Sequence, residues 1–225
     1  MDIEKEYQKP GAYKYGLKIA SLHAEAFASY ATRGAETIAV PKGEYVLLER
    51  VLGEHQLLVV RVGAHGRFEY RERATGAVAA KADIRIFLEG EGAEAHIIGR
   101  YDLSGATDLD LFHEIRHLAS GTRSRIVTRG VLADAAHLIY RSAIGMEGEL
   151  MGLDGEESGR FLVLSGDAVL DAIPALATGS KAVDARHALS VSRPPEEELF
   201  YMTSRGLSRP DARSLYVEGF LNTHV

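Results

Sequence analysis

The chain has 225 residues, of which 46% are hydrophobic, and its formal net charge at pH 7 is −6. It contains no cysteine, which excludes disulfides, thiolate nucleophiles and cysteine-ligated zinc or iron–sulfur sites built from this chain alone. There is no apolar run near the roughly 20 residues that span a bilayer, no basic-then-apolar signal at the N-terminus, and no basic excess to suit a nucleic-acid backbone. We therefore expect a soluble, cytoplasmic globular protein that binds neither nucleic acid nor membrane.

Residues 1–35 predict an N-terminal helical segment. Leu17, Ala20, Ala24 and Phe27 recur at steps of three and four residues among helix-forming neighbours, which is the periodicity of one helix face. Gly34 is a suitable C-terminal stop for this helix.

Short β-type runs fill residues 36–192. Each run has about the length of one strand, and each tends to be followed by Gly, Asp or Ser instead of a helix-length segment. A weak internal echo links HIIGR at 96–100 with HLIYR at 137–141. Recurrence of a strand–turn unit is typical of a β-solenoid, in which each coil buries its face against its neighbours. A β-sandwich stays open on this pattern alone.

The pattern changes again at Pro194-Pro195, where residues 193–225 predict a helical hairpin. Three glutamates follow at 196–198, and acidic charge there faces the positive end of the helix dipole. We expect this helix to stop at Gly206 and a second helix to begin after Ser208. The expected inner faces carry Leu199, Phe200, Leu215 and Phe220, which leaves Arg205 and Arg209 free to meet a partner.

Residues 113–117 read HEIRH, which matches the H-E-x-x-H pattern of zinc hydrolases. On a helix, His113 and His117 would share one face and bind Zn²⁺, with Glu114 as general base. However, the surrounding segment alternates in polarity, and on a strand the two histidines would lie about 13 Å apart, too far for a shared zinc. We prefer a strand without a helix across 111–118 and keep the zinc hydrolase as the alternative function. A β-helix enzyme acting on carbohydrate would need paired carboxylates, for which Asp154 and its acidic neighbours are the only candidates.

The C-terminal third carries a longer and more specific pattern. The stretch EEELFYMTSRGLSRPDARSLYVEGFL at 196–221 resembles the closing helical segment of the SufB/SufD family. The matching residues are Glu196, Leu199, Phe200, Tyr201, Ser204, Arg205, Gly206, Leu207, Ala212, Leu215, Gly219 and Phe220. Upstream, TRSRIVTRGVL at 122–132 and EGEGAEAHIIGRY at 89–101 are also similar to family patterns, so the resemblance spans about residues 36 to 225.

The resemblance implies a right-handed parallel β-helix over 36–192 and a non-enzymatic role as a scaffold subunit in iron–sulfur cluster assembly. The expected partner is a SufC-type ABC ATPase, docked on the C-terminal helical segment. The partner-binding residues that the resemblance implies are Leu199, Phe200, Tyr201, Arg205, Gly206 and Phe220. It also implies pairing of subunits, as a homodimer or as a heterodimer with a SufB/SufD-type paralogue.

The chain departs from the SufB-type pattern at its cluster-related positions. Gly159 stands near the position where SufB-type members carry a cysteine. Only His187 matches a residue of the family's cluster-related set, and in this the chain resembles SufD-type members. The candidate cluster-related residues are therefore His187, Glu157 and Glu156, with His187 as the one candidate ligand for iron. Sites without thiolates hold clusters weakly, so we expect no tightly bound cofactor and a transient cluster held together with partner subunits.

Overall fold

The computed structural model describes residues 35–146, 148–180 and 182–222, and these form twelve strands followed by two helices. The strands run from Glu36 to Ser192 and the helices from Glu196 to Asn222. The expected N-terminal helix lies outside the described residues. No helix in the described part of the chain is long and apolar enough to cross a membrane.

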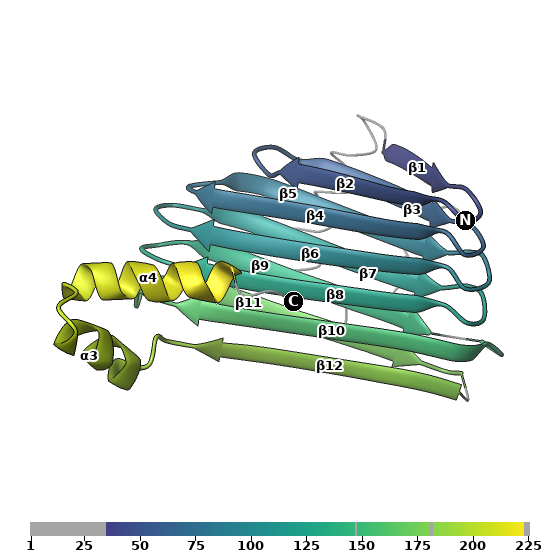
Figure 1. The fold of residues 1–225 in the computed structure, drawn as a ribbon. Coiled ribbons are helices and arrows are strands. Elements are labelled where there is room, and N and C mark those ends of the chain that lie inside the picture. Colours follow the sequence, from purple (N-terminus) through teal and green to yellow (C-terminus); the bar gives the residue numbers. More distant parts are fainter. Residues whose placement is uncertain (1–34, 147, 181, 223–225) are drawn as a thin grey trace.

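The strands form two six-stranded sheets in which all neighbours are parallel (Figure 1). Sheet A contains, in order, β1 (Glu36–Val40), β3 (Gln56–Val62), β5 (Ala79–Leu88), β7 (Asp108–His117), β9 (His137–Met146) and β11 (Val169–Thr178). Sheet B contains, in order, β12 (Ala182–Ser192), β10 (Met151–Val163), β8 (Arg123–Leu132), β6 (Glu94–Leu103), β4 (Arg67–Gly76) and β2 (Tyr45–Val51). The chain alternates between the sheets, so that each coil adds one strand to each. The predicted solenoid is confirmed, with about 5 turns.

The register stacks equivalent residues of successive coils. In sheet A, Ala79 pairs with Asp108 and Asp108 with His137. Alternate residues point inward, and the interior is filled by two clusters of buried side chains. One cluster is rich in isoleucine and the other in leucine and aromatic rings. Burying each such side chain contributes about 1.5–3 kcal/mol.

The internal echo in the sequence does not mark equivalent positions. His96 lies on β6 in sheet B and His137 on β9 in sheet A, so the two segments belong to opposite walls of the solenoid. Each coil contributes one strand to each sheet, so two strands of similar sequence can belong to different sheets. The solenoid is confirmed, but the two similar segments are not equivalent positions of successive coils.

One glycine permits the close stacking of turns between coils. A Cβ added at Gly90 would lie 1.9 Å from the backbone nitrogen of Ala64 in the turn of the preceding coil. Only glycine allows two backbones to approach so closely.

The C-terminal helices begin and end as predicted. Helix α3 (Glu196–Ser204) follows Pro195 and carries three glutamates in its first turn. The chain then turns at Gly206, where φ is +100°. Ser208 precedes α4 (Arg209–Asn222), and its hydroxyl oxygen accepts a hydrogen bond from the backbone N–H of Asp211 at 3.2 Å. This is N-capping of α4 by Ser208.

Helix α4 packs on β8 and β6 of sheet B, and α3 packs on α4 (Figure 1). The guanidinium of Arg129 on β8 donates to the carbonyl of Phe220 at 3.0 Å and lies 5.4 Å from the centre of its ring. Arg213 donates to the carbonyl of Leu164 at 2.8 Å. These contacts fix the helical pair beside the solenoid.

Candidate functional site

The HEIRH segment lies on strand β7, as the alternation of its residues predicted. His113 is fully buried, and its Nε2 lies 2.7 Å from Oε1 of Glu72. His117 instead contacts the hydroxyls of Thr122 and Ser124 at 2.7 and 2.8 Å. Each imidazole therefore has its own separate partners inside the solenoid. Nothing in this arrangement supports the zinc hydrolase alternative.

Glu114, the expected general base of that alternative, points to the other side of β7. Its carboxylate pairs with Arg116 at 2.7 Å and with Arg85 at 3.4 Å. Because adjacent residues of a strand face opposite ways, Glu114 cannot act at a site formed by the inward histidines.

His187 and Glu157 are brought together at the last coil of the solenoid. His187 lies on β12 in register with Glu157 on β10, and residues paired in this way point to the same face of the sheet. His187 is exposed, whereas the Glu157 side chain is buried. Burial raises the pKa of the Glu157 carboxyl, against the opposing effects of a hydrogen bond from Ser142 and of nearby His187.

The carboxylate of Glu157 is only partly satisfied. Oε1 accepts hydrogen bonds from the hydroxyls of Ser142 and Tyr140, whereas Oε2 is buried and has no hydrogen-bond partner in the described part of the chain. A buried carboxylate oxygen without a partner is costly. This atom therefore has unused capacity to accept a hydrogen bond or bind a cation.

Glu156 lies on the opposite face of β10 from Glu157. Its carboxylate pairs with Arg125 on the neighbouring strand at 3.3 Å. The structure thus brings His187 and Glu157 together and separates Glu156 from both.

Gly159 lies on the same inward row of β10 as Glu157. A Cβ added there would lie 2.6 Å from a methyl group of Leu189 on β12 and 3.2 Å from the ring of Phe161. The space beside this glycine is therefore filled by apolar side chains of this chain.

Sequence reasoning missed a connected set of buried polar side chains inside the solenoid, which runs from Glu72 to Glu157 and is called the interior polar chain. Its first part surrounds the carboxylate of Glu72, which accepts hydrogen bonds from the hydroxyls of Tyr70 and Tyr101 and contacts His113. Burial by itself would raise the pKa of Glu72, but the charge and hydrogen bond of His113 and the two tyrosine hydroxyls bring it below its ordinary value.

The second part of the interior polar chain ends at Glu157. The hydroxyl of Tyr140 accepts from Thr128 at 3.1 Å and donates to Glu157 at 3.4 Å. The rings of His113 and Tyr140 meet edge to face with centroids 6.1 Å apart, which joins the two parts. These residues stand out in the sequence only as polar residues at inward positions of the strands. They could not be recognised until it was known which alternate residues of each strand face the interior.

The helical pair corrects one expectation about its inner faces. Leu199 is buried, but Phe200 is 72% exposed and Leu215 is 52% exposed. Placing these two residues inside was wrong, because the short helices bury only a narrow face against each other and against sheet B. Phe220 is partly buried against Arg129, as expected.

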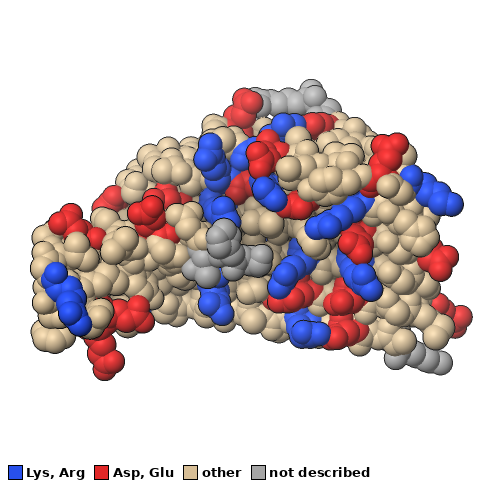
Figure 2. Space-filling model, in the orientation of Figure 1, with Lys and Arg blue, Asp and Glu red and all other residues tan. Residues whose placement is uncertain are grey.

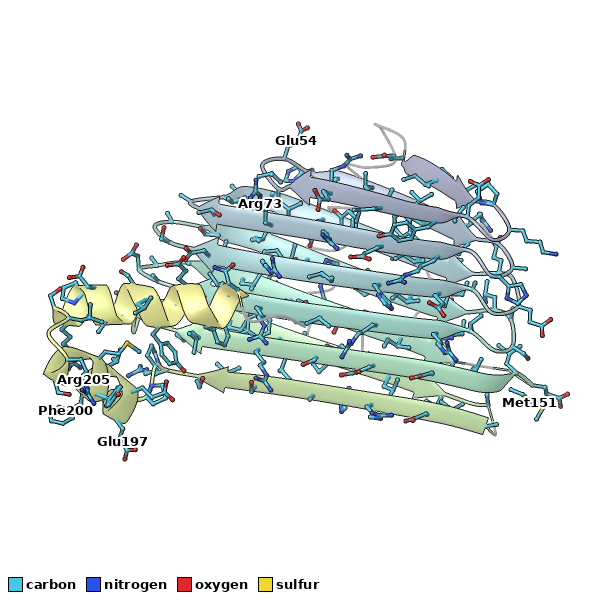
Figure 3. The ribbon with its side chains drawn as sticks, viewed as in Figure 1. Glu54, Arg73, Met151, Glu197, Phe200 and Arg205 are labelled. Atoms are coloured by element: carbon cyan, nitrogen blue, oxygen red, sulfur yellow. The ribbon has the colours of Figure 1, made fainter. Side chains whose placement is uncertain are left out.

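The six candidate docking residues divide by exposure. Phe200 and Tyr201 are exposed at 72% and 60%, and the guanidinium of Arg205 lies 5.2 Å from the centre of the Tyr201 ring. Figure 3 shows Phe200 and Arg205 pointing away from the solenoid. The other three serve the fold: Leu199 is buried, Phe220 packs against Arg129, and Gly206 forms the turn.

Within the described residues, no further strand follows the last coil, and this C-terminal end of the solenoid is called the open end. Strands β11 and β12 are the final strands of their sheets, and each pairs with only one neighbour in the described part of the chain. Val169, Leu189 and Val191 are 48%, 37% and 52% exposed there. His187 lies at this same end. Among the described residues, no group of three or more His, Asp or Glu side chains is arranged to hold a metal ion.

These features define a class of protein: a two-sheet parallel β-solenoid with a pair of C-terminal helices packed on one sheet. Residues 55–220 match the family model described as SUF system FeS cluster assembly, SufBD core domain. The chain belongs to the SufBD family.

Curated relatives support this assignment. The chain is 29% identical over 136 residues to an iron-sulfur cluster assembly SufBD family protein of Methanothermobacter thermautotrophicus (strain Winter), a match that covers 60% of this chain and 33% of the relative. It is 26% identical over 157 residues to a family member of Staphylococcus saprophyticus, covering 70% and 34%. It is 28% identical over 153 residues to one of Mycobacterium leprae, covering 64% and 39%. The chain therefore spans about a third of the length of these relatives.

Proposed function

We propose that this chain is a non-enzymatic scaffold subunit that works in the cytoplasm with a SufC-type ABC ATPase during iron–sulfur cluster assembly. Membership of the SufBD family supports the process. The observation that carries the partnership is the pair of exposed aromatic side chains on α3, Phe200 and Tyr201. Exposed aromatic residues clustered with an arginine are typical of the residues that dominate protein–protein binding.

The docking surface in this proposal consists of Phe200, Tyr201 and Arg205. The partner covers both rings and removes their apolar area from water, which stabilises the complex by roughly 25 cal/mol for each Å² buried. Arg205 keeps Tyr201 in place through the cation–π contact and offers hydrogen-bond donors to an acidic group.

The open end of the solenoid serves subunit pairing in this proposal. The outer edges of β11 and β12 present backbone groups that can pair with another strand, and the apolar side chains beside them favour burial. The partner is a second copy of this chain or a SufB/SufD-type paralogue.

The cluster is cargo that is held transiently at this open end. His187 supplies an exposed imidazole, and the buried Glu157 in register with it supplies a carboxylate oxygen without a hydrogen-bond partner. Further ligands come from the paired subunit or from outside the protein, because this chain has no thiolate. Glu156 takes no part, since it faces outward toward Arg125.

Calorimetric titration of the full chain with a SufC-type ATPase tests the proposal. The double variant Phe200→Ala/Tyr201→Ala should bind roughly tenfold or more weakly, since two exposed aromatic anchors are lost. Met151→Ala is the matched control, because Met151 is 67% exposed and lies at the start of β10, on the side of the solenoid away from the helices (Figure 3). Equal affinity of the double variant and the control would overturn the docking assignment.

A further inference from the structure

Four arginines form a ladder across the outer face of sheet B. In register, Arg73 on β4 pairs with Arg100 on β6, Arg100 with Arg129 on β8, and Arg129 with Arg160 on β10. Neighbouring strands lie about 4.8 Å apart, so four positive charges follow one another at that spacing. Figure 2 shows basic side chains in a row across the strands on this face.

The arginine ladder differs from the other arginines of the same face. Arg71, Arg123 and Arg125 each pair with a carboxylate, at 2.5, 3.2 and 3.3 Å. By contrast, no acidic side chain of the described residues lies within ion-pair distance of any of the four ladder arginines. Like charges at adjacent positions of a sheet destabilise the fold. Such an arrangement suits a surface that receives negative charge from a ligand.

Arg129 adds an independent observation. Only 8% of this residue is exposed, and its Nε is buried with no hydrogen-bond partner in the described part of the chain. A buried guanidinium N–H without an acceptor is unfavourable. Burial and the neighbouring Arg160 and Arg100 also lower the pKa of Arg129. The positive charge at the centre of the ladder is therefore destabilised, and nearby negative charge would stabilise it.

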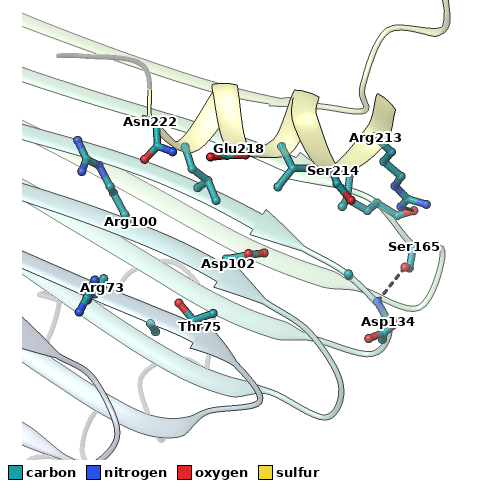
Figure 4. Close-up of a pocket in the computed structure, with 15 residues that line it drawn as sticks. Arg73, Thr75, Arg100, Asp102, Asp134, Ser165, Arg213, Ser214, Glu218 and Asn222 are labelled. Atoms are coloured by element: carbon teal, nitrogen blue, oxygen red, sulfur yellow. Dashed lines mark hydrogen bonds between the residues drawn. The ribbon is translucent and has the colours of Figure 1, made fainter. Parts of the chain in front are cut away.

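A groove of about 680 Å³ lies beside the ladder, between α4 and the C-terminal ends of β4 and β6 (Figure 4). Arg73 and Arg100 lie at one end of it, and Asp134 and Ser165 lie at the other. A second hollow of about 610 Å³ is lined by the same two arginines. The two hollows thus share the Arg73–Arg100 pair, and the first has the size of a small-molecule site.

The remaining lining of the groove is mixed. Its carboxylates are Asp102, Asp134 and Glu218, of which Asp134 already accepts a hydrogen bond from the backbone of Gly105 at 2.9 Å. Thr75 and Asn222 supply further polar groups, and α4 contributes apolar side chains. Negative charge on a ligand is therefore favoured at the arginine end of the groove.

We propose that this groove binds an anion with two linked phosphate groups, with Arg73 and Arg100 each holding one phosphate. Guanidinium groups bind phosphate through two parallel hydrogen bonds, and neighbouring strands present two such groups side by side. The ligand is either a free diphosphate or the diphosphate of a nucleotide whose nucleoside lies along α4. This site is separate from the docking residues on α3 and from His187.

Isothermal titration calorimetry of the full chain alone, with inorganic pyrophosphate and with ADP, tests the proposal. Pyrophosphate should bind more tightly than orthophosphate, and tighter binding of ADP than of pyrophosphate would identify a nucleotide as the ligand. Equal affinity for ADP and pyrophosphate would identify the phosphates as the whole recognition element. Absence of binding by both would overturn the proposal.

The variants Arg73→Gln and Arg100→Gln should each weaken pyrophosphate binding by roughly tenfold, because each removes a charge-assisted hydrogen-bonding group. Arg160→Gln is the matched control, because Arg160 belongs to the ladder, is exposed and lines neither hollow. Its affinity should stay within about twofold of the unmodified chain. If Arg160→Gln weakens binding as much as Arg100→Gln, the anion responds to general charge and the groove is not its site.

Discussion

Acidification should destabilise the protein through one buried histidine, His117. Its ring is 1% exposed at the end of β7, and burial lowers its pKa to about 4. The hydroxyl of Thr122 donates to the carbonyl of Ala119 at 2.9 Å, so its oxygen accepts from Nδ1–H of His117. Nε2 then accepts from the hydroxyl of Ser124. The neutral ring is fully satisfied by these two contacts, and a second ring proton has no acceptor without rearrangement.

The size of the effect follows from the two pKa values. The unfolded chain takes up a proton on His117 below its ordinary pKa of 6.5, whereas the folded protein does so only near 4. Between these values the unfolded state binds more protons, so the free energy of unfolding falls as the pH falls from 6.5 to 4. At about 1.4 kcal/mol per pH unit, the loss from this residue is about 3 kcal/mol.

Urea unfolding between pH 7.5 and pH 4 measures this loss. In His117→Gln the side-chain amide keeps a donor and an acceptor but cannot titrate. Between pH 7.5 and pH 4 the free energy of unfolding of this variant should therefore fall by about 3 kcal/mol less than that of the unmodified protein. An NMR titration of the imidazole in the unmodified protein should place the pKa of His117 below 5. Identical pH dependence of the two proteins would show that this ring is not the buried neutral group described above.

Two further substitutions test the packing of the solenoid. Glu72→Gln removes the carboxylate charge that faces buried His113 and should lower the free energy of unfolding by about 3 kcal/mol or more. Glu49→Gln, in an exposed ion pair with Arg71, is the control and should cost at most about 1 kcal/mol. Equal losses in urea unfolding would refute the buried pair. Gly90→Ala should have a much lower melting temperature than the control Gly53→Ala. A methyl group at position 90 collides with a neighbouring backbone, whereas one at position 53 meets nothing within 4 Å. Equal melting temperatures would contradict the close approach of the two turns.

Much of the fold could be predicted because it rests on local patterns. The alternation of residues 108–117 identified a strand where a five-residue motif suggested a metal-binding helix. The two prolines, the three glutamates and the capping serine defined both C-terminal helices. Each of these signals acts within a few residues, so no knowledge of the tertiary structure was needed.

The remaining features depend on register between distant strands. The arginine ladder joins residues from four coils whose intervals differ in length, because the connecting turns differ, so no fixed period marks it in the sequence. The same holds for the pairing of His187 with Glu157 across two strands. The exposure of Phe200 could not be read either, because helical spacing does not say how much of a short helix its neighbours cover.

Cluster assembly itself is the most direct test of the scaffold proposal. Under anaerobic conditions the full chain is mixed with a SufC-type ATPase, ATP, ferrous iron, sulfide and any paralogous subunit, and the rate of cluster transfer to an apo-ferredoxin is followed by its visible absorption. The proposal predicts faster transfer than without the chain, and slower transfer with His187→Ala, which should fold and bind the ATPase like the unmodified chain because His187 is exposed. A transfer rate that is the same with and without the chain would contradict the scaffold function.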